Sequence, residues 1–240
     1  MSLRKVIIFF TLLFLIILSS CSKTDEDNPV APKKNEPAKL ELKEITVPPH
    51  LTQVQDEHAQ MAASYIQMAN SLTNYAAFFT PPNGAKQANG IQDEWTWTEE
   101  NLTITLVYSE GESSNYWKVI LTGFYEGFTA TNWTFMEAEQ SKDDNTGHLT
   151  IYKPVTTNVA VNFEWSNNAG GNESFIYTDF KSSMKMQIDV GKNNSGVLQL
   201  FQGAEGQFVL EYKINWTATG SGEWWEYDKT GNIISHGTWT

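Results

Sequence analysis

The C-terminal part of the chain alternates between apolar and polar residues with a period of two. From about residue 92 to the end, apolar side chains occupy every second position of short runs, such as Leu102–Tyr108 and Phe208–Trp216. Successive side chains of a β-strand point to opposite faces of a sheet, so this pattern predicts strands with one buried face. Turn sequences rich in Gly and Asn separate the runs, for example Asn193-Asn194-Ser195-Gly196. We expect about 11–12 strands, at the spacing of roughly 12 residues that is typical of an all-β sandwich or barrel.

A helix is expected before these strands, over about residues 53–79. Its apolar residues recur at spacings of three, four and seven, which places them on one face. Thr52 and Gln55 fit a capping box at its start, and Pro81 and Pro82 end it. The expected stripe consists of Val54, Met61, Tyr65, Met68, Leu72, Tyr75, Ala76 and Phe79. We expect this stripe to pack on the sheet, although a coiled-coil partner helix would also cover it.

The order of these elements predicts the fold. The loops between the strands are too short for the crossovers that parallel strands need, so the strands pair in antiparallel fashion. A long meander that curls around the helix hides the helix stripe and one sheet face together. The prediction is a mostly β fold, in which one long N-terminal helix packs on a curved antiparallel meander, an open barrel or half-barrel.

The N-terminus has the layout of a secretory signal peptide. Arg4 and Lys5 are followed by an almost unbroken apolar run from Val6 to Leu18, and then by Ser19, Ser20 and Cys21. The run has about 13 residues, whereas a membrane-spanning helix needs roughly 20. Residues 1–20 are therefore interpreted as a cleaved signal peptide. Cys21 is the only cysteine, so the domain contains no disulfide bond.

The residues around Cys21 resemble the processing signals of bacterial lipoproteins. Leu18-Ser19-Ser20-Cys21 is similar to a lipobox, which implies that Cys21 is lipidated and anchors the protein to a membrane; the alternative is an ordinary free thiol. Ser22-Lys23-Thr24-Asp25-Glu26-Asp27 resembles the acidic export signal of surface-exposed lipoproteins of Bacteroidetes-type bacteria. That resemblance implies an outer-membrane lipoprotein on the cell surface, whereas an acidic linker without this role would leave the domain facing the periplasm.

Residues 21–49 are expected to form the lipidated cysteine and a flexible tether. The segment is rich in Pro, Lys, Glu and Asn and poor in aliphatic residues, so it buries too little apolar surface to offset its loss of conformational entropy. Residues 50–240 are then one domain that contains the helix and the β-meander.

The charge of the chain excludes two classes of partner. The formal net charge is −12, and removal of Arg4 and Lys5 with the signal peptide makes the mature chain more acidic still. Nucleic acids are bound mainly through Lys and Arg, and anionic lipid headgroups repel such a surface. We therefore expect no nucleic-acid partner, and contact with the membrane only through the lipid on Cys21.

The sequence contains no recognisable catalytic or cofactor motif. The four histidines, His50, His58, His148 and His236, do not have metal-ligand spacing. There is no phosphate-binding glycine loop and no G-x-S-x-G nucleophile elbow. We expect no enzyme activity, no metal and no cofactor.

Aromatic residues are the most unusual feature, since the chain has nine Trp, nine Tyr and thirteen Phe. Adjacent residues of a strand face opposite sides, so one ring of each of the pairs Tyr116-Trp117 and Trp224-Trp225 must point away from the core unless both faces are covered. An outward ring offers an amphipathic platform for a sugar or a protein. The candidate binding residues are Trp224, Glu226, Trp117 and Trp133.

The faces of Trp224 and Trp225 can be assigned in two ways. Either Trp225 and Tyr227 point outward, or Trp224 and Glu226 do. A buried carboxylate is costly unless it is paired, which favours Trp224 and Glu226 outside and Trp225 in the core.

The arrangement of anchor, helix and curved sheet resembles that of periplasmic lipoprotein-carrier proteins, in architecture alone. Three functions are compatible with the sequence. The first is a non-catalytic lipoprotein that recognises a glycan or protein at the cell envelope. The others are a carrier of a hydrophobic ligand held between helix and sheet, and a structural or assembly subunit of an envelope complex.

Overall fold

The computed structural model describes residues 36–240 except 43, 89–92, 168–170 and 204–205. The expected signal peptide, Cys21 and the acidic residues that follow it lie outside this part of the chain. Within the described residues, no helix is long and apolar enough to cross a membrane.

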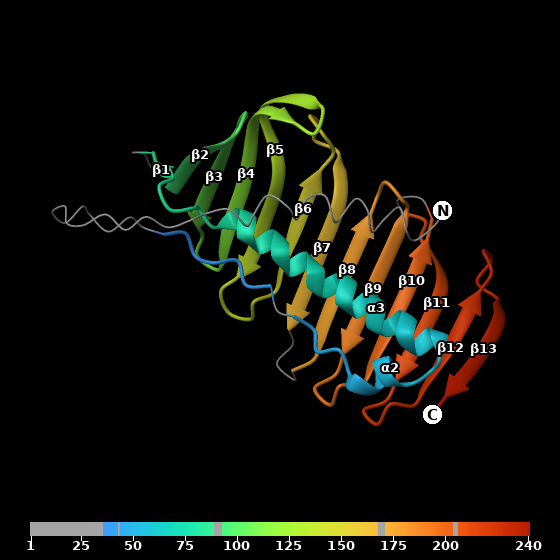
Figure 1. Cartoon of the computed structure of the whole chain (residues 1–240). Coiled ribbons are helices and arrows are strands. Elements are labelled where there is room, and N and C mark those ends of the chain that lie inside the picture. Colours follow the sequence, from blue (N-terminus) through green and yellow to red (C-terminus); the bar gives the residue numbers. More distant parts are fainter. Residues whose placement is uncertain (1–35, 43, 89–92, 168–170, 204–205) are drawn as a thin grey trace. The chain divides into compact units, whose positions relative to one another are not determined.

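The sheet is one antiparallel meander in which each strand pairs only with its neighbours in sequence (Figure 1). The thirteen strands are β1 Lys86–Gln87, β2 Asp93–Glu99, β3 Leu102–Glu110, β4 Ser114–Tyr125, β5 Phe128–Ser141, β6 Gly147–Tyr152, β7 Val159–Asn167, β8 Glu173–Asp179, β9 Met184–Val190, β10 Gly196–Gln202, β11 Val209–Trp216, β12 Gly222–Tyr227 and β13 Ile233–Trp239. The sheet is open in the described chain, because β1 and β13 stand at opposite ends of the strand order. The prediction of a mostly β, antiparallel fold is therefore confirmed, with thirteen strands in place of the expected 11–12.

The helical segment is shorter and less regular than predicted. It consists of α2 Pro49–Gln53, α3 Glu57–Ser71 and the 3-10 helix η2 Leu72–Phe79. The side chain of Asp56 caps α3 by accepting hydrogen bonds from the backbone N–H groups of His58 (2.9 Å) and Ala59 (3.1 Å). The expected capping box at Thr52 and Gln55 and the single long helix are thus both wrong, because Asp56 starts a new helix after a break.

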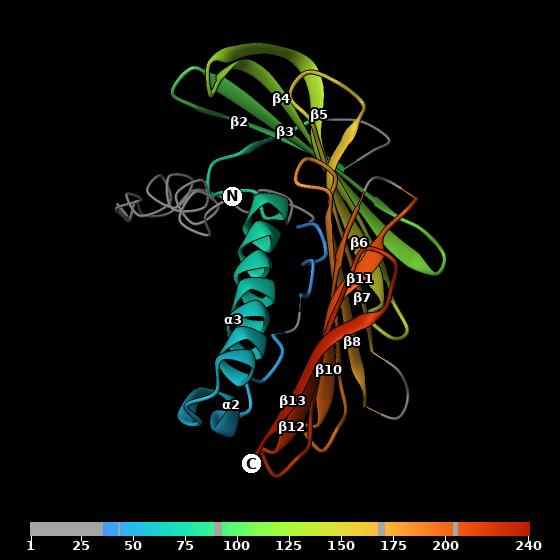
Figure 2. The same ribbon diagram turned by 90° about the vertical axis from the view of Figure 1, so that its right-hand side faces the viewer.

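The face of α3 that packs on the sheet is built from small residues. Figure 2 shows α3 lying along one face of the sheet, which we call the inner face. Of the predicted stripe only Leu72 and Phe79 are fully buried, while Met61, Tyr65 and Met68 are half-buried flanking residues. The fully buried positions of α3 are His58, Ala59, Ala62, Ala63, Ile66 and Ala69. Alanine adds little to an apolar stripe in the sequence, yet its small side chain lets the helix approach the sheet closely.

The prediction of a flexible tether up to residue 49 is wrong for its last part. Residues 36–42 and 44–48 run between α3 and the sheet (Figure 2), where Leu40 and Ile45 are buried. The compact unit therefore begins well before the predicted boundary at residue 50. Composition indicated an unfolded segment because its few aliphatic residues are spread thinly, but two of them reach the core.

A contact between Trp and Gly recurs at three hairpins along one end of the sheet. A Cβ on Gly147, Gly196 or Gly222 would lie 2.5, 2.2 or 2.0 Å from the indole of the Trp directly opposite it on the next strand. Only glycine therefore fits beneath these rings. The three indoles are those of Trp165, Trp216 and Trp239, and each donates a hydrogen bond to a turn carbonyl, of Asn145 (2.6 Å), Asn194 (2.9 Å) and Gly220 (2.7 Å) respectively. Each ring thus holds the turn that precedes its glycine in place.

Candidate functional site

The outer face of the sheet, opposite α3, presents one continuous row of side chains. Strand register aligns Tyr116, Glu139, His148, Glu164, Ile176, Gln187, Gln199, Lys213, Trp225 and His236 on β4–β13. With neighbouring strands roughly 4.8 Å apart, the row is about 43 Å long. It is rich in carboxylates and amides, which are groups that accept and donate hydrogen bonds in water.

Two adjoining hollows in this face form the candidate site, which we call the outer groove. Their volumes are about 560 Å³ and 480 Å³, and both are lined by Ser166 and Ser174. The first hollow is lined by Ser114, Glu139, Ser141, Thr146, Gly147, His148, Asn162, Glu164, Trp165 and Ile176. The second is lined by Asn172, Glu173, Asp189, Val190, Gly191, Ser195, Gly196, Val197, Asn215 and Trp216. The groove therefore crosses the strands from β4 to β11.

The outer groove is polar and acidic. Glu139, Glu164, Glu173 and Asp189 contribute carboxylates, and none of its described lining residues is Lys or Arg. His148 lies between Glu139 and Glu164 in the strand register. Such a lining repels anions and accepts hydrogen bonds from hydroxyl and amine groups.

Hydrogen bonds between neighbouring side chains hold part of this lining in place. The Thr150 hydroxyl donates to Asn162 Oδ1 (3.1 Å), and Asn162 Nδ2 donates to Glu164 Oε1 (2.9 Å). Gln187 Nε2 donates to Asp189 Oδ2 (2.8 Å) in the same way. These contacts orient two of the carboxylates before any ligand arrives, which lowers the entropic cost of binding.

The structure places Trp224 and Glu226 on the inner face, so the favoured assignment of this pair is wrong. The Trp224 ring stacks on the ring of His58 in α3, with centroids 3.7 Å apart and an interplanar angle of 8°. Glu226 is only half-buried and bonds to Tyr212; burial, followed by this hydrogen bond, raises the pKa of the Tyr212 hydroxyl. Because Glu226 stays partly exposed to water and is paired with Tyr212, its inward position avoids most of the desolvation cost of a buried carboxylate.

Trp225 points outward instead, but its ring is already in contact with neighbours. The ring of His236 on β13 stacks on it with centroids 5.2 Å apart, and Lys213 Nζ on β11 lies 5.4 Å from its centroid. Since β11 and β13 flank β12 on opposite sides, the indole lies between these two side chains. It is not an open platform for a sugar ring.

Trp117 and Trp133, the other two candidate binding residues, belong to the core. Trp117 is 2% exposed, packs against Phe79 and donates its indole N–H to the carbonyl of Ala38 (2.9 Å). Trp133 is buried among Phe128 and Phe135. The outward member of the Tyr116-Trp117 pair is Tyr116, which is 42% exposed.

The space between helix and sheet holds little free volume. The hollow found there among the described residues measures about 30 Å³, roughly the share of liquid volume that one water molecule occupies. It adjoins Ile45, Asn70 and Leu72, together with Leu42, Ala69, Thr73, Leu149, Phe163, Trp165 and Phe175. A carrier cavity for a hydrophobic ligand is therefore not open in this state of the chain. No group of His, Cys, Asp or Glu side chains in the described chain is arranged to hold a metal ion.

The residues of the outer groove were not singled out from the sequence. Glu139, His148 and Glu164 are polar residues at alternate strand positions, and each alone is typical of a solvent-facing site. The register that aligns them across β5, β6 and β7 is set by turns and by packing of the other face. No family model matches this chain, and no curated protein matches it, so the site rests on its own geometry.

Proposed function

We propose that the protein is a non-catalytic binding lipoprotein that recognises an extended, uncharged glycan in the outer groove. The observation that carries this proposal is the groove itself: two adjoining hollows of about 560 and 480 Å³, lined by hydroxyls, amides and carboxylates and by no described Lys or Arg. Carboxylate and amide oxygens accept hydrogen bonds from sugar hydroxyls, and the acidic lining disfavours uronic or sulfated chains. A protein partner fits less well, because the centre of a protein interface is depleted of charged residues and enriched in apolar and aromatic ones.

Glycan binding should be tested with the mature chain on an array that includes neutral and anionic glycans, followed by calorimetry on the best neutral ligand. Glu139→Ala and Asp189→Ala should each weaken binding about 10–100-fold, because a hydrogen bond to a charged group contributes roughly 1.5–3 kcal/mol. The ligand should be recovered intact by mass spectrometry, as expected of a non-catalytic protein.

The matched control is Glu112→Ala, which removes the same charge from an exposed turn residue outside the groove. It should leave the dissociation constant unchanged. A preference for anionic glycans, no binding on the array, or equal losses in Glu112→Ala and Asp189→Ala would each contradict the proposal.

The proposed anchor is a lipid on Cys21, which places the protein in the outer membrane, with the domain on the cell surface if Asp25, Glu26 and Asp27 act as an export signal. The Cys21→Ser variant should remain an unprocessed precursor, since the thiol is the atom that lipidation modifies. The measurement is the mass of the isolated protein and its partitioning into detergent. Processing and partitioning like those of the unmodified protein would rule out the anchor.

A further inference from the structure

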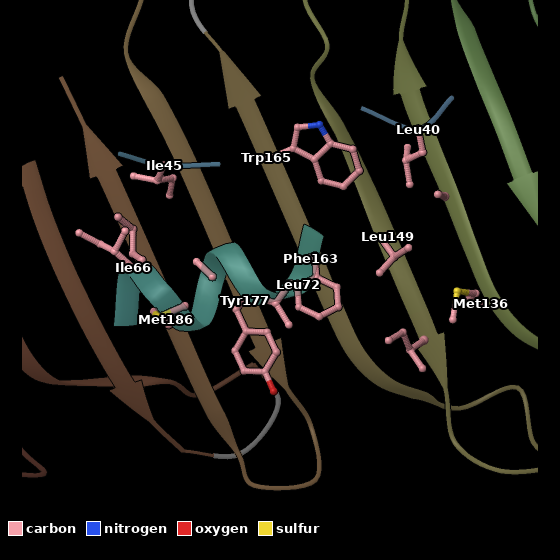
Figure 3. Close-up of a cluster of buried hydrophobic side chains, with 14 of the residues drawn as sticks. Leu40, Ile45, Ile66, Leu72, Met136, Leu149, Phe163, Trp165, Tyr177 and Met186 are labelled. Carbon is pink, nitrogen blue, oxygen red and sulfur yellow. The ribbon is translucent and has the colours of Figure 1, made fainter. Parts of the chain in front are cut away.

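Residues 36–42 and 44–47 lie as an extended strap between the helix and the sheet, without belonging to either. In Figure 2 this segment follows the inner face beside α3. Its side chains Leu40 and Ile45 are each 5% exposed, and Figure 3 shows them on either side of Trp165. The segment thus occupies a cleft in the manner of a bound peptide.

Two side-chain amides hold the strap by its backbone. Gln140 on β5 accepts a hydrogen bond from Glu41 N (3.1 Å) and donates one to Glu41 O (2.7 Å). Asn70 in α3 accepts one from Ile45 N (2.8 Å) and donates one to Ile45 O (2.8 Å). Each side-chain amide therefore binds both the backbone N–H and the backbone C=O of one strap residue. An extended polypeptide presents these two groups in this way.

A third side chain also binds the backbone of the strap, since the indole N–H of Trp117 donates a hydrogen bond to Ala38 O (2.9 Å). Within the described residues, no backbone–backbone hydrogen bond joins residues 36–47 to a strand or helix. Release of the strap thus breaks side-chain hydrogen bonds and apolar contacts but leaves the ladder of the sheet intact. Such a segment opens at a lower free energy than the whole domain.

We propose that the cleft between α3 and the inner face is a binding site for an extended polypeptide, and that residues 36–47 fill it as an exchangeable internal ligand. The ligand carries two apolar side chains five residues apart, as Leu40 and Ile45 are. This site is separate from the outer groove and does not depend on the proposed glycan.

The side-chain amides of Gln140 and Asn70 favour a peptide over a lipid as the ligand. Gln140 is 4% exposed, and its amide has donors and acceptors that an acyl chain cannot satisfy. A lipid in place of the strap would leave Gln140 Oε1 and the Asn70 amide without the partners that the strap backbone supplies, and unpaired polar groups away from water are costly. A polypeptide satisfies both amides through its backbone, whatever its sequence at those two positions.

The first experiment is hydrogen exchange on the intact mature chain. The amides of Glu41 and Ile45 should exchange at least tenfold faster than those of Met186 and Ile188, which lie on the interior strand β9, because the strap opens locally. Equal rates, at the level of global unfolding, would show a fixed structural segment and overturn the proposal.

The second experiment uses a fluorescent peptide with the sequence of residues 36–47. A protein variant with Leu40→Ser and Ile45→Ser in its own strap should bind this peptide at least tenfold more tightly than the unmodified protein, because its internal competitor is weakened. Gln140→Leu in that variant should reduce binding at least tenfold, whereas the exposed-site change Glu112→Ala should not.

A peptide that carries the same two Ser substitutions is the matched control ligand and should bind at least tenfold more weakly. Equal binding of both peptides would overturn the site. Binding of a fluorescent long-chain fatty acid in place of the peptide would do so as well, and would favour a lipid carrier. If the variant fails to fold by circular dichroism, the exchange rates of the unmodified chain decide the question alone.

Discussion

Trp117→Ala should lower the free energy of unfolding by about 3–5 kcal/mol, the usual cost of removing a buried aromatic side chain. The ring is 2% exposed and packs between Phe79 of η2 and Tyr108 of β3. Its loss removes contacts with both layers and leaves the Ala38 carbonyl without its indole donor. Urea unfolding followed by far-UV circular dichroism measures the change.

Trp117→Phe is the matched control for this prediction. It keeps an aromatic ring in the core but removes the hydrogen bond to Ala38, and a net loss of about 1 kcal/mol is expected for that bond, plus a smaller packing loss. A change within roughly 0.5 kcal/mol for Trp117→Ala is typical of a surface position. That result would mean that the Trp117 ring is not packed in the core, and Trp117 would again be a candidate for ligand binding.

Leu72→Ala should lower the free energy of unfolding by about 2–5 kcal/mol, as for other buried leucines. Leu72 is 3% exposed at the start of η2, where the α-helix tightens into a 3-10 helix. The cavity left behind adjoins an existing hollow of about 30 Å³. Because that hollow is itself unfilled, we expect the neighbouring side chains not to relax into the new cavity. The same urea titration serves as the measurement.

Gln67→Ala is the control, because Gln67 lies on the exposed side of α3. It should change stability by less than about 0.5 kcal/mol. Equal effects of the two substitutions would mean that the helical segment does not pack on the sheet in solution.

The strands could be predicted because their signal is local. Alternation in Leu102–Tyr108 marks β3, and Asn193-Asn194-Ser195-Gly196 marks the turn between β9 and β10. These features depend on the pleat and on turn conformation, which a few adjacent residues determine. Local periodicity also predicts the position of the helical segment. It does not predict the buried face of α3, because that face consists mainly of alanines, which contribute little to an apolar pattern.

Features that depend on distant residues could not be predicted. In the sequence, Leu40 and Ile45 are isolated aliphatic residues in a polar segment. The backbone of that segment is held by hydrogen bonds to Gln140 and Asn70, which lie far along the chain. The register of β12 places Trp224 on the inner face opposite Ile214, where its ring stacks on His58 of α3. The outer groove depends on the register of eight strands, β4 to β11, which no short stretch of sequence contains.

The strict neighbour-to-neighbour order of the strands has a consequence for how the chain acquires its structure. Every strand from β2 to β12 is bonded to the strand just before it and the strand just after it, so each ladder closes a short loop and contact order stays low for a β protein. During synthesis, each new strand can form its hydrogen bonds with the preceding strand as soon as it emerges, because no strand pairs with a partner distant in sequence. Stability then resembles a sum of nearest-neighbour terms, and evolution can lengthen or shorten such a sheet by whole hairpins while the rest of the ladder stays in register.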